Sequence, residues 1–68
     1  MIAKRINVYG MNCEHCAKSV DRALSSLKGI SSVVVSLEGK FADVTYDENF
    51  VGIPEIKKAV SDAGYRTD

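Results

Sequence analysis

The sequence predicts an α+β fold in which a four-stranded antiparallel sheet carries two helices on one face. The chain of 68 residues is 46% hydrophobic and 26% charged, which is typical of an ordinary globular domain. Apolar residues recur at every second position in some segments, as in a strand, and at every third or fourth position in others, as in a helix. These segments follow one another in the order strand, helix, strand, and this order occurs twice. A glycine follows each helical segment, at Gly29 and Gly64, where a left-handed residue commonly ends a helix.

The first half of the chain begins with a strand and continues with a helix. Residues 5–9 alternate between apolar and polar side chains, which indicates a half-buried strand. From about Glu14 the apolar residues recur at steps of three and four, as far as Leu27. This spacing predicts an amphipathic helix that Gly29 terminates.

Two further strands follow the first helix. Alternation over residues 32–37 predicts the second strand, with Val34 as the one apolar residue on the polar side. Residues 38–40 form a turn, and residues 41–46 alternate again as a third strand, with Phe41 on the polar side as an isolated exposed apolar residue.

A second helix and a short last strand complete the order. The helix starts near Pro54, which suits a first helical position, and ends at Gly64. Residues 65–67 are all that remains for a fourth strand. The predicted core consists of apolar residues from both halves: Val20, Leu24, Leu27, Val33, Val35, Val44, Ile56 and Val60.

The order of these elements restricts the topology. Because each predicted strand has one apolar face, both helices should cover the same side of one sheet. Right-handed crossovers then produce the split βαβ, ferredoxin-like βαββαβ sandwich. No linker or low-complexity tract interrupts the chain, so we expect residues 1–68 to form a single domain.

Composition argues against several classes of partner. Nine basic residues balance nine acidic ones, so no net charge draws the chain to nucleic acid. The longest apolar run is residues 33–35, far short of a membrane span, and no signal peptide precedes the first strand. We therefore expect a cytoplasmic protein without membrane insertion, in which closely spaced cysteines remain reduced.

Cys13 and Cys16 lie where the first strand leads into the first helix. Both sulfurs should be near unpaired backbone N–H groups and the positive end of the helix dipole, which stabilise thiolate. Two thiolates without oxygen ligands form a soft site that selects Cu(I) or a similar ion. A structural zinc site normally needs four protein ligands, more than two cysteines and one histidine supply. A redox-active pair is the alternative, although the thioredoxin-like fold needs a longer chain.

The motif Gly-Met-Asn-Cys-Glu-His-Cys after a first strand, in a βαββαβ chain of this length, resembles the heavy-metal-associated domain family. Within the family the chain is most similar to the free-standing bacterial copper chaperones. The resemblance implies that Cys13 and Cys16 bind one Cu(I) in a near-linear arrangement, with Ag(I), Hg(II) or Zn(II) as alternative ions in vitro. It implies delivery by thiolate exchange to a copper-transporting P-type ATPase or a copper-responsive regulator, and no enzymatic activity.

Alternatives within this family remain open. The same fold serves as the metal-binding domain of larger heavy-metal transporters and as mercury-binding proteins. A small thiol-disulfide oxidoreductase is the alternative from another class. We expect a monomer without metal, with a metal-bridged dimer as the alternative for the loaded form.

Four residues near the cysteines receive roles from their position and from the resemblance. Met11 should anchor the loop from beneath as a core side chain. Asn12 stands where the family more often has Thr or Ser, and it can still accept from backbone N–H groups at a helix start. His15 should point outward, with a role in the outer sphere or between two chains. Tyr65 follows Gly64 and should return to the loop, where the resemblance suggests that it screens the copper.

Overall fold

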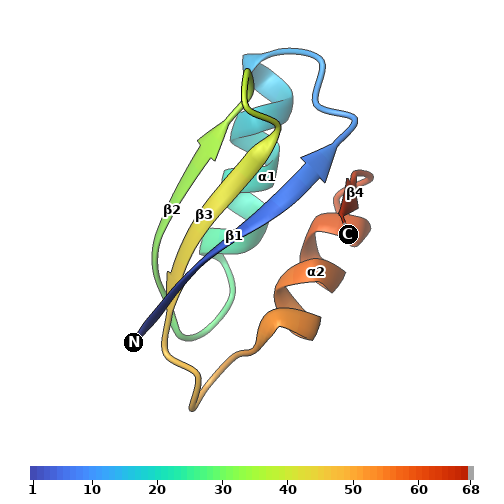
Figure 1. The fold of residues 1–68 in the computed structure, drawn as a ribbon. Coiled ribbons are helices and arrows are strands. Elements are labelled where there is room, and N and C mark those ends of the chain that lie inside the picture. Colours follow the sequence, from blue (N-terminus) through green and yellow to red (C-terminus); the bar gives the residue numbers. More distant parts are fainter. Residues whose placement is uncertain (68) are drawn as a thin grey trace.

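A computed structural model of the chain describes residues 1–67. Strands and helices follow one another in the predicted order, coloured from blue to red in Figure 1. The elements are β1 (Ile2–Tyr9), α1 (Glu14–Ser25), β2 (Ile30–Ser36), β3 (Phe41–Tyr46), α2 (Ile53–Asp62) and β4 (Arg66–Thr67).

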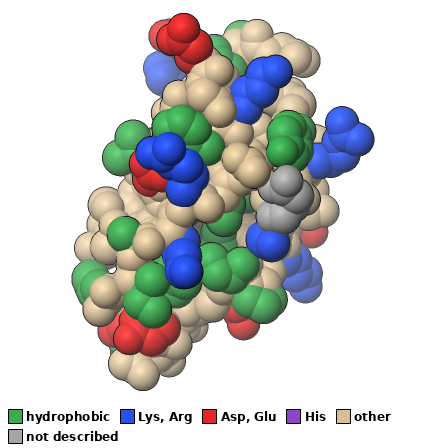
Figure 2. Space-filling model, in the orientation of Figure 1, with side chains coloured by type: hydrophobic (Ala, Val, Ile, Leu, Met, Phe, Trp, Pro, Cys, Tyr) green, Lys and Arg blue, Asp and Glu red, His purple; other side chains and the backbone are tan. Residues whose placement is uncertain are grey.

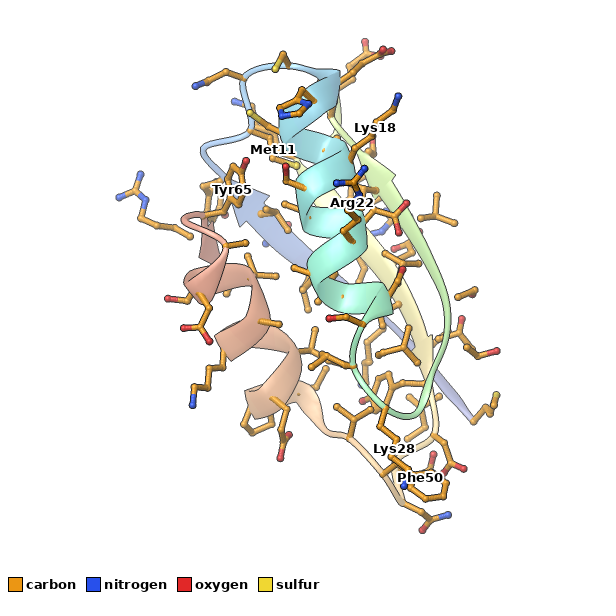
Figure 3. All side chains as sticks on the ribbon, turned by 180° about the vertical axis from the view of Figure 1, so that it is seen from behind. Met11, Lys18, Arg22, Lys28, Phe50 and Tyr65 are labelled. Atoms are coloured by element: carbon orange, nitrogen blue, oxygen red, sulfur yellow. The ribbon has the colours of Figure 1, made fainter. Side chains whose placement is uncertain are left out.

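The four strands form one sheet in the order β2-β3-β1-β4, and all neighbouring strands are antiparallel. Both helices lie on the same face of the sheet, in the foreground of Figure 3 and behind the strands in Figure 1. The predicted α+β, ferredoxin-like fold is therefore confirmed. Neither helix within residues 1–67 has the length and apolar character that a membrane span requires.

The strand pairs differ greatly in length. β1 and β3 pair continuously from Ile2 opposite Tyr46 to Asn7 opposite Phe41. β4, in contrast, pairs with β1 only at Val8 and Tyr9. Within the described residues, the rest of that edge of β1 has no strand beside it.

The core lies between the sheet and the helices. Five of the predicted core residues are almost fully buried, and Leu27, Val33 and Val35 are partly buried beside them. Exposed Val34, at 62%, is on the polar side as expected. Met11 is buried as predicted, and the list of predicted core residues omitted several other buried side chains: Ile6, Val8, Ala42, Tyr46 and Val51.

The end of α1 differs from the prediction. The helix ends at Ser25, before Gly29, and the N–H of Leu27 donates to the carbonyl of Leu24 in a tighter turn. Gly29 has φ +93° and leads into β2 rather than capping the helix. A Cβ at this position would come within 2.7 Å of Phe50 Cβ, so the close approach of two loops also requires glycine.

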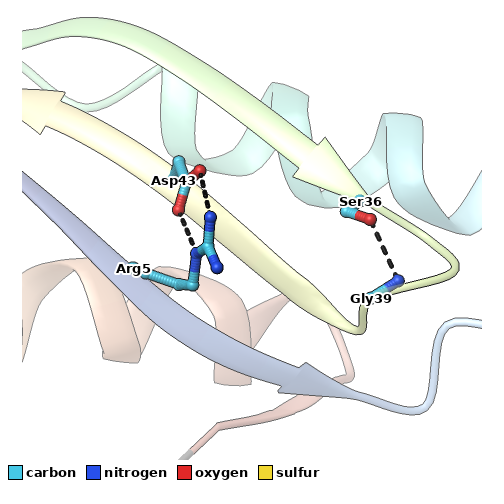
Figure 4. Close-up of polar contacts among 4 residues, drawn as sticks. All are labelled: Arg5, Ser36, Gly39 and Asp43. Atoms are coloured by element: carbon cyan, nitrogen blue, oxygen red, sulfur yellow. Dashed lines mark hydrogen bonds and ion pairs between the residues drawn. The ribbon is translucent and has the colours of Figure 1, made fainter.

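The face of the sheet away from the helices carries charged and polar side chains with apolar ones between them (Figure 2). The Arg5 guanidinium donates to both carboxylate oxygens of Asp43 at 2.8 and 3.2 Å (Figure 4), which lowers the pKa of Asp43. The same guanidinium lies 3.8 Å from the centre of the Phe41 ring. Phe41 is therefore half-buried beneath Arg5, and the expectation of an isolated exposed side chain was wrong.

Candidate metal centre

The loop between β1 and α1 is fixed at its start by a glycine and a buried methionine. Gly10 has φ +99°, a left-handed conformation that turns the chain out of the strand. Met11 is then only 8% exposed and belongs to the hydrophobic core. Its side chain reaches inward from the loop in Figure 3. The structure therefore places Met11 beneath the loop, as expected from the sequence.

The two cysteines occupy defined positions at the start of α1. Cys13 is the N-cap residue, with extended backbone angles of φ −160° and ψ 172°, and Cys16 is the third residue of the helix. Cys13 is exposed and Cys16 half-buried, and neither is in a disulfide. The Cys13 thiol donates to Cys16 Sγ across 3.7 Å.

This spacing suits a single soft ion. Two metal–sulfur bonds of about 2.3 Å each span at most about 4.6 Å when they are collinear. The observed 3.7 Å lies within that limit, and the exposed Cys13 side chain is free to swing outward. Within residues 1–67 no three His, Cys, Asp or Glu side chains converge as a metal-binding group. The donor set that these residues offer at the loop is therefore the pair of sulfurs.

The surroundings of Cys16 favour its thiolate. Its pKa is lowered from the ordinary 9.0 to about 7. The largest cause is a hydrogen bond from the backbone N–H of Asn12, followed by hydrogen bonds from the Tyr65 hydroxyl and the Cys13 thiol. Donors that stabilise a charged acceptor lower its pKa. The sequence predicted a lowered thiol pKa from the helix start, and the structure assigns the main cause to specific N–H and O–H donors.

Tyr65 reaches the cysteines from the opposite end of the chain. Gly64 has φ +98° and ends α2, and the N–H of Tyr65 donates to the carbonyl of Val60. This turn brings the half-buried Tyr65 side chain back to the loop between β1 and α1, the metal loop (Figure 3). There its hydroxyl hydrogen-bonds to Cys16. The neighbouring thiolate and partial burial raise the pKa of Tyr65, so its proton stays available for donation.

Ser19 is a polar neighbour that the sequence analysis missed. It lies one turn after Cys16 on α1, and its hydroxyl donates to the carbonyl of His15 at 3.1 Å. Its hydroxyl also lies beside that of Tyr65 and opposes the rise of the Tyr65 pKa. Ser19 comes three residues after Cys16, and residues at this spacing share one face of a helix. This spacing was the signal in the sequence that could have identified Ser19 as a neighbour of the cysteines.

The remaining two candidates lie at the surface. The Asn12 side chain is exposed, and the expectation that its amide accepts from backbone N–H groups stays a prediction. The N-cap is Cys13, and Asn12 acts on Cys16 through its own backbone N–H. His15 is exposed, as expected, and is the second residue of α1.

Comparison with characterised proteins gives consistent results. The heavy-metal-associated domain family matches residues 5–66. The copper chaperone CopZ of Staphylococcus haemolyticus is 46% identical over 65 residues, which cover 96% of each chain. The copper chaperone CopZ of Bacillus subtilis is 40% identical over 96% of this chain and 94% of its own.

Solved structures agree in fold. A copper-binding domain from a P-type ATPase superposes with a TM-score of 0.98 at 35% identity, covering 100% of this chain and 92% of that one. A CopZ metallochaperone has a TM-score of 0.95 at 36% identity, over 98% and 100%. Oxidized MerP from Ralstonia metallidurans has a TM-score of 0.94 at 34% identity, over 98% and 93%. The chain belongs to the heavy-metal-associated domain family.

Proposed function

We propose that this chain is a copper chaperone, a single domain that binds one Cu(I) through Cys13 and Cys16. The observation that carries the proposal is the pair of thiols 3.7 Å apart at the start of α1, one of them with a pKa of about 7. Thiolates select soft ions such as Cu(I) over hard ones. The full-length similarity to copper chaperones of the CopZ type supports the same role.

Transfer by ligand exchange follows from the exposure of the site. A two-coordinate ion leaves room for an incoming sulfur, so a third thiolate can bind before the first one leaves. Cys13 is the more exposed ligand and is the one that we expect to release the ion first. The partner is a thiolate-bearing domain, and the similarity to a copper-binding domain of a P-type ATPase favours such a transporter over a copper-responsive regulator. We place this exchange in the cytoplasm, with no covalent catalysis by the chaperone.

Each neighbour has a separate role in this proposal. Met11 holds the loop to the core, and Tyr65 donates to Cys16 and shields the inner side of the ion. His15 faces outward, where a partner or a second chain approaches.

The deciding experiment is Cu(I) titration under anaerobic conditions in competition with a chelator of known affinity. We expect one high-affinity Cu(I) per chain, lost in the Cys13→Ser plus Cys16→Ser variant. Retention of tight binding in that variant would refute the assignment. Sedimentation of the loaded protein distinguishes a monomer from a metal-bridged dimer.

Two alternative functions are tested with the same protein. The similarity to MerP makes a mercury-binding role the second candidate, and tighter retention of Hg(II) than of Cu(I) by thiol competitors would favour it. Turnover in an insulin-reduction assay, lost on Cys16→Ser, would favour a thiol-disulfide oxidoreductase.

A further inference from the structure

The long strand β1 has an edge that β4 covers only in part. β4 pairs with Val8 and Tyr9 near the metal loop, and within residues 1–67 no strand lies along the same edge from Ile2 to Ile6. In Figure 1, β4 accompanies only the loop end of β1. An uncovered strand edge presents backbone N–H and C=O groups that another strand can pair with.

The direction of these backbone groups follows from the pairing on the other edge. The N–H of Val8 donates to the carbonyl of Lys40, towards β3, and the register between β1 and β3 runs without a bulge from that point to Ile2. Residues of an antiparallel strand direct their backbone groups to alternate sides. Ala3 and Arg5, which differ from Val8 by an odd number of positions, therefore direct theirs to the uncovered edge.

Beside this edge lies a shallow groove between β1 and α2, with a volume of about 220 Å³. Its lining combines an apolar floor, Ile6 and Ile53, with the lysines Lys4 and Lys57, and contains no carboxylate. Within residues 1–67 neither lysine makes an ion pair. The Arg5 guanidinium, in contrast, is held by Asp43 on the opposite face of the sheet.

We propose that this edge binds an extended acidic segment of a partner protein as an added β-strand. The outward backbone groups of Ala3 and Arg5 supply the strand pairing, and Lys4 and Lys57 pair with carboxylates on the side of the strand that faces α2. A nucleic acid strand would use the lysines but would leave the backbone ladder unpaired. A second copy of this chain would bring its own Lys4 and Lys57 to the same groove, which like-charge repulsion disfavours.

The uncovered edge of β1 lies away from the cysteines, so a partner that docks there does not block metal exchange. Ala3 and Arg5 lie in the half of β1 that is remote from the metal loop (Figure 1). A partner could therefore hold the chain at this edge while the cysteines remain accessible to its metal-binding domain. The proposal adds a docking surface to the copper site and does not depend on copper being the ion.

The test uses a short fluorescent peptide that alternates glutamate and valine, with the same peptide carrying lysine for glutamate as a comparison. We expect the acidic peptide alone to bind, to slow amide hydrogen exchange at Ala3 and Arg5, and to bind equally to the Cys13→Ser plus Cys16→Ser variant. Lys4→Glu combined with Lys57→Glu should weaken binding by at least about tenfold. Lys18→Glu combined with Lys58→Glu changes the net charge equally at sites outside the groove, and it should leave most of the affinity intact.

A backbone variant tests strand pairing independently of charge. Ala3→Pro removes an outward N–H without removing a bond to β3, so it should weaken the peptide complex, whereas Ala3→Val should not. Circular dichroism shows whether each variant is folded.

Several results would overturn the proposal. These are equal loss of binding in both double charge variants, no change in exchange at Ala3 and Arg5, and equal binding of the lysine peptide. Sedimentation that shows a dimer paired through Ala3 and Arg5 would assign the edge to a second copy of the chain instead. If the edge pairs with a second copy, or if no peptide binds, the acidic partner is refuted. Lys4 would then serve only to protect the strand edge from pairing with wrong partners.

Discussion

The two junctions at which a strand leads into a helix share two structural features but differ in their chemistry. Each inserts one apolar side chain into the core before the helix starts, Met11 in the first and Val51 in the second. Each N-cap residue, Cys13 and Gly52, has an extended backbone. The junctions differ in what satisfies the free N–H groups at the helix start.

At the second junction a carboxylate serves this purpose. Glu55 is the third residue of α2, and its Oε2 accepts from the N–H of Gly52 at 3.0 Å. This is half of the capping box that commonly begins a helix. The preceding turn is also held internally, because Asp47 accepts from the N–H groups of Asn49, Phe50 and Val51.

At the first junction a sulfur occupies the equivalent position. Cys16 is the third residue of α1, and it accepts from the N–H groups of Asn12 and of the N-cap residue Cys13. The two cysteines thus stand at the two side-chain positions of a capping box, N-cap and third residue. The comparison shows how the spacing of two intervening residues places both sulfurs at one helix start, and why Cys16 has a lowered pKa.

The largest expected effect comes from restoring an ordinary cap at the first junction. Cys13→Ser places a hydroxyl at the N-cap, where it can accept from a helix N–H, and should stabilise the metal-free protein by about 1 kcal/mol. The same change removes a proposed metal ligand. Cu(I) affinity should therefore fall by more than the roughly 10–100-fold loss that follows from changing residues around a ligand. Urea denaturation and chelator competition measure the two effects. Unchanged copper affinity would contradict the assignment of Cys13 as a ligand.

The buried anchors of the two junctions provide the next test. Met11→Ala leaves a cavity and should cost about 2–5 kcal/mol of folding stability. It should also speed Cu(I) release, because the loop that carries Cys13 loses its attachment to the core. Val51→Ala is the matched control, which should lower stability but leave the release rate unchanged. Equal release rates in the two variants would mean that Met11 serves folding alone.

Glu55→Ala should have a smaller effect, confined to stability. It removes the acceptor for the Gly52 N–H at the start of α2, and loss of a cap costs about 1 kcal/mol. Copper affinity should not change, since the second junction carries no ligand. Glu14→Ala, in the first turn of the other helix, controls for loss of a negative charge near a helix N-terminus.

The smallest expected effect concerns the pH dependence of the rate at which the Cys16 thiol is alkylated. Its alkylation rate should rise through about pH 7, where the thiolate forms. Tyr65→Phe removes one of its hydrogen-bond donors and should move this midpoint upward, towards the ordinary value. The shift should be only partial, because the Asn12 N–H is the larger cause. Iodoacetamide labelling of a Cys13→Ser background measures the midpoint, and an unchanged or lower value in Tyr65→Phe would contradict the proposed donation.

Periodicity was sufficient to predict the elements and the topology, because strand and helix periods alternate clearly along the chain. It did not predict the end of α1, since Leu27 continues the apolar stripe into a turn that is no longer helical. Buried residues outside the regular stripes, such as Val51, were also missed because a junction buries a single side chain without any period. The position of Tyr65 after Gly64 in the predicted fold placed it at the loop, and family resemblance suggested only its screening role. Ser19 was not predicted, because its place in the site depends on Tyr65 lying beside it.

The central pair of strands has a consequence for the order of assembly during synthesis. β1 pairs with β3 along its length, so residues near the start of the chain find their partners only after Tyr46 has been made. Contacts between distant parts of a sequence close late and slow folding. Both cysteines leave the ribosome before β3, the strand that pairs with β1. The nascent chain therefore carries two accessible thiols before the folded sheet and core can fix the loop that holds them.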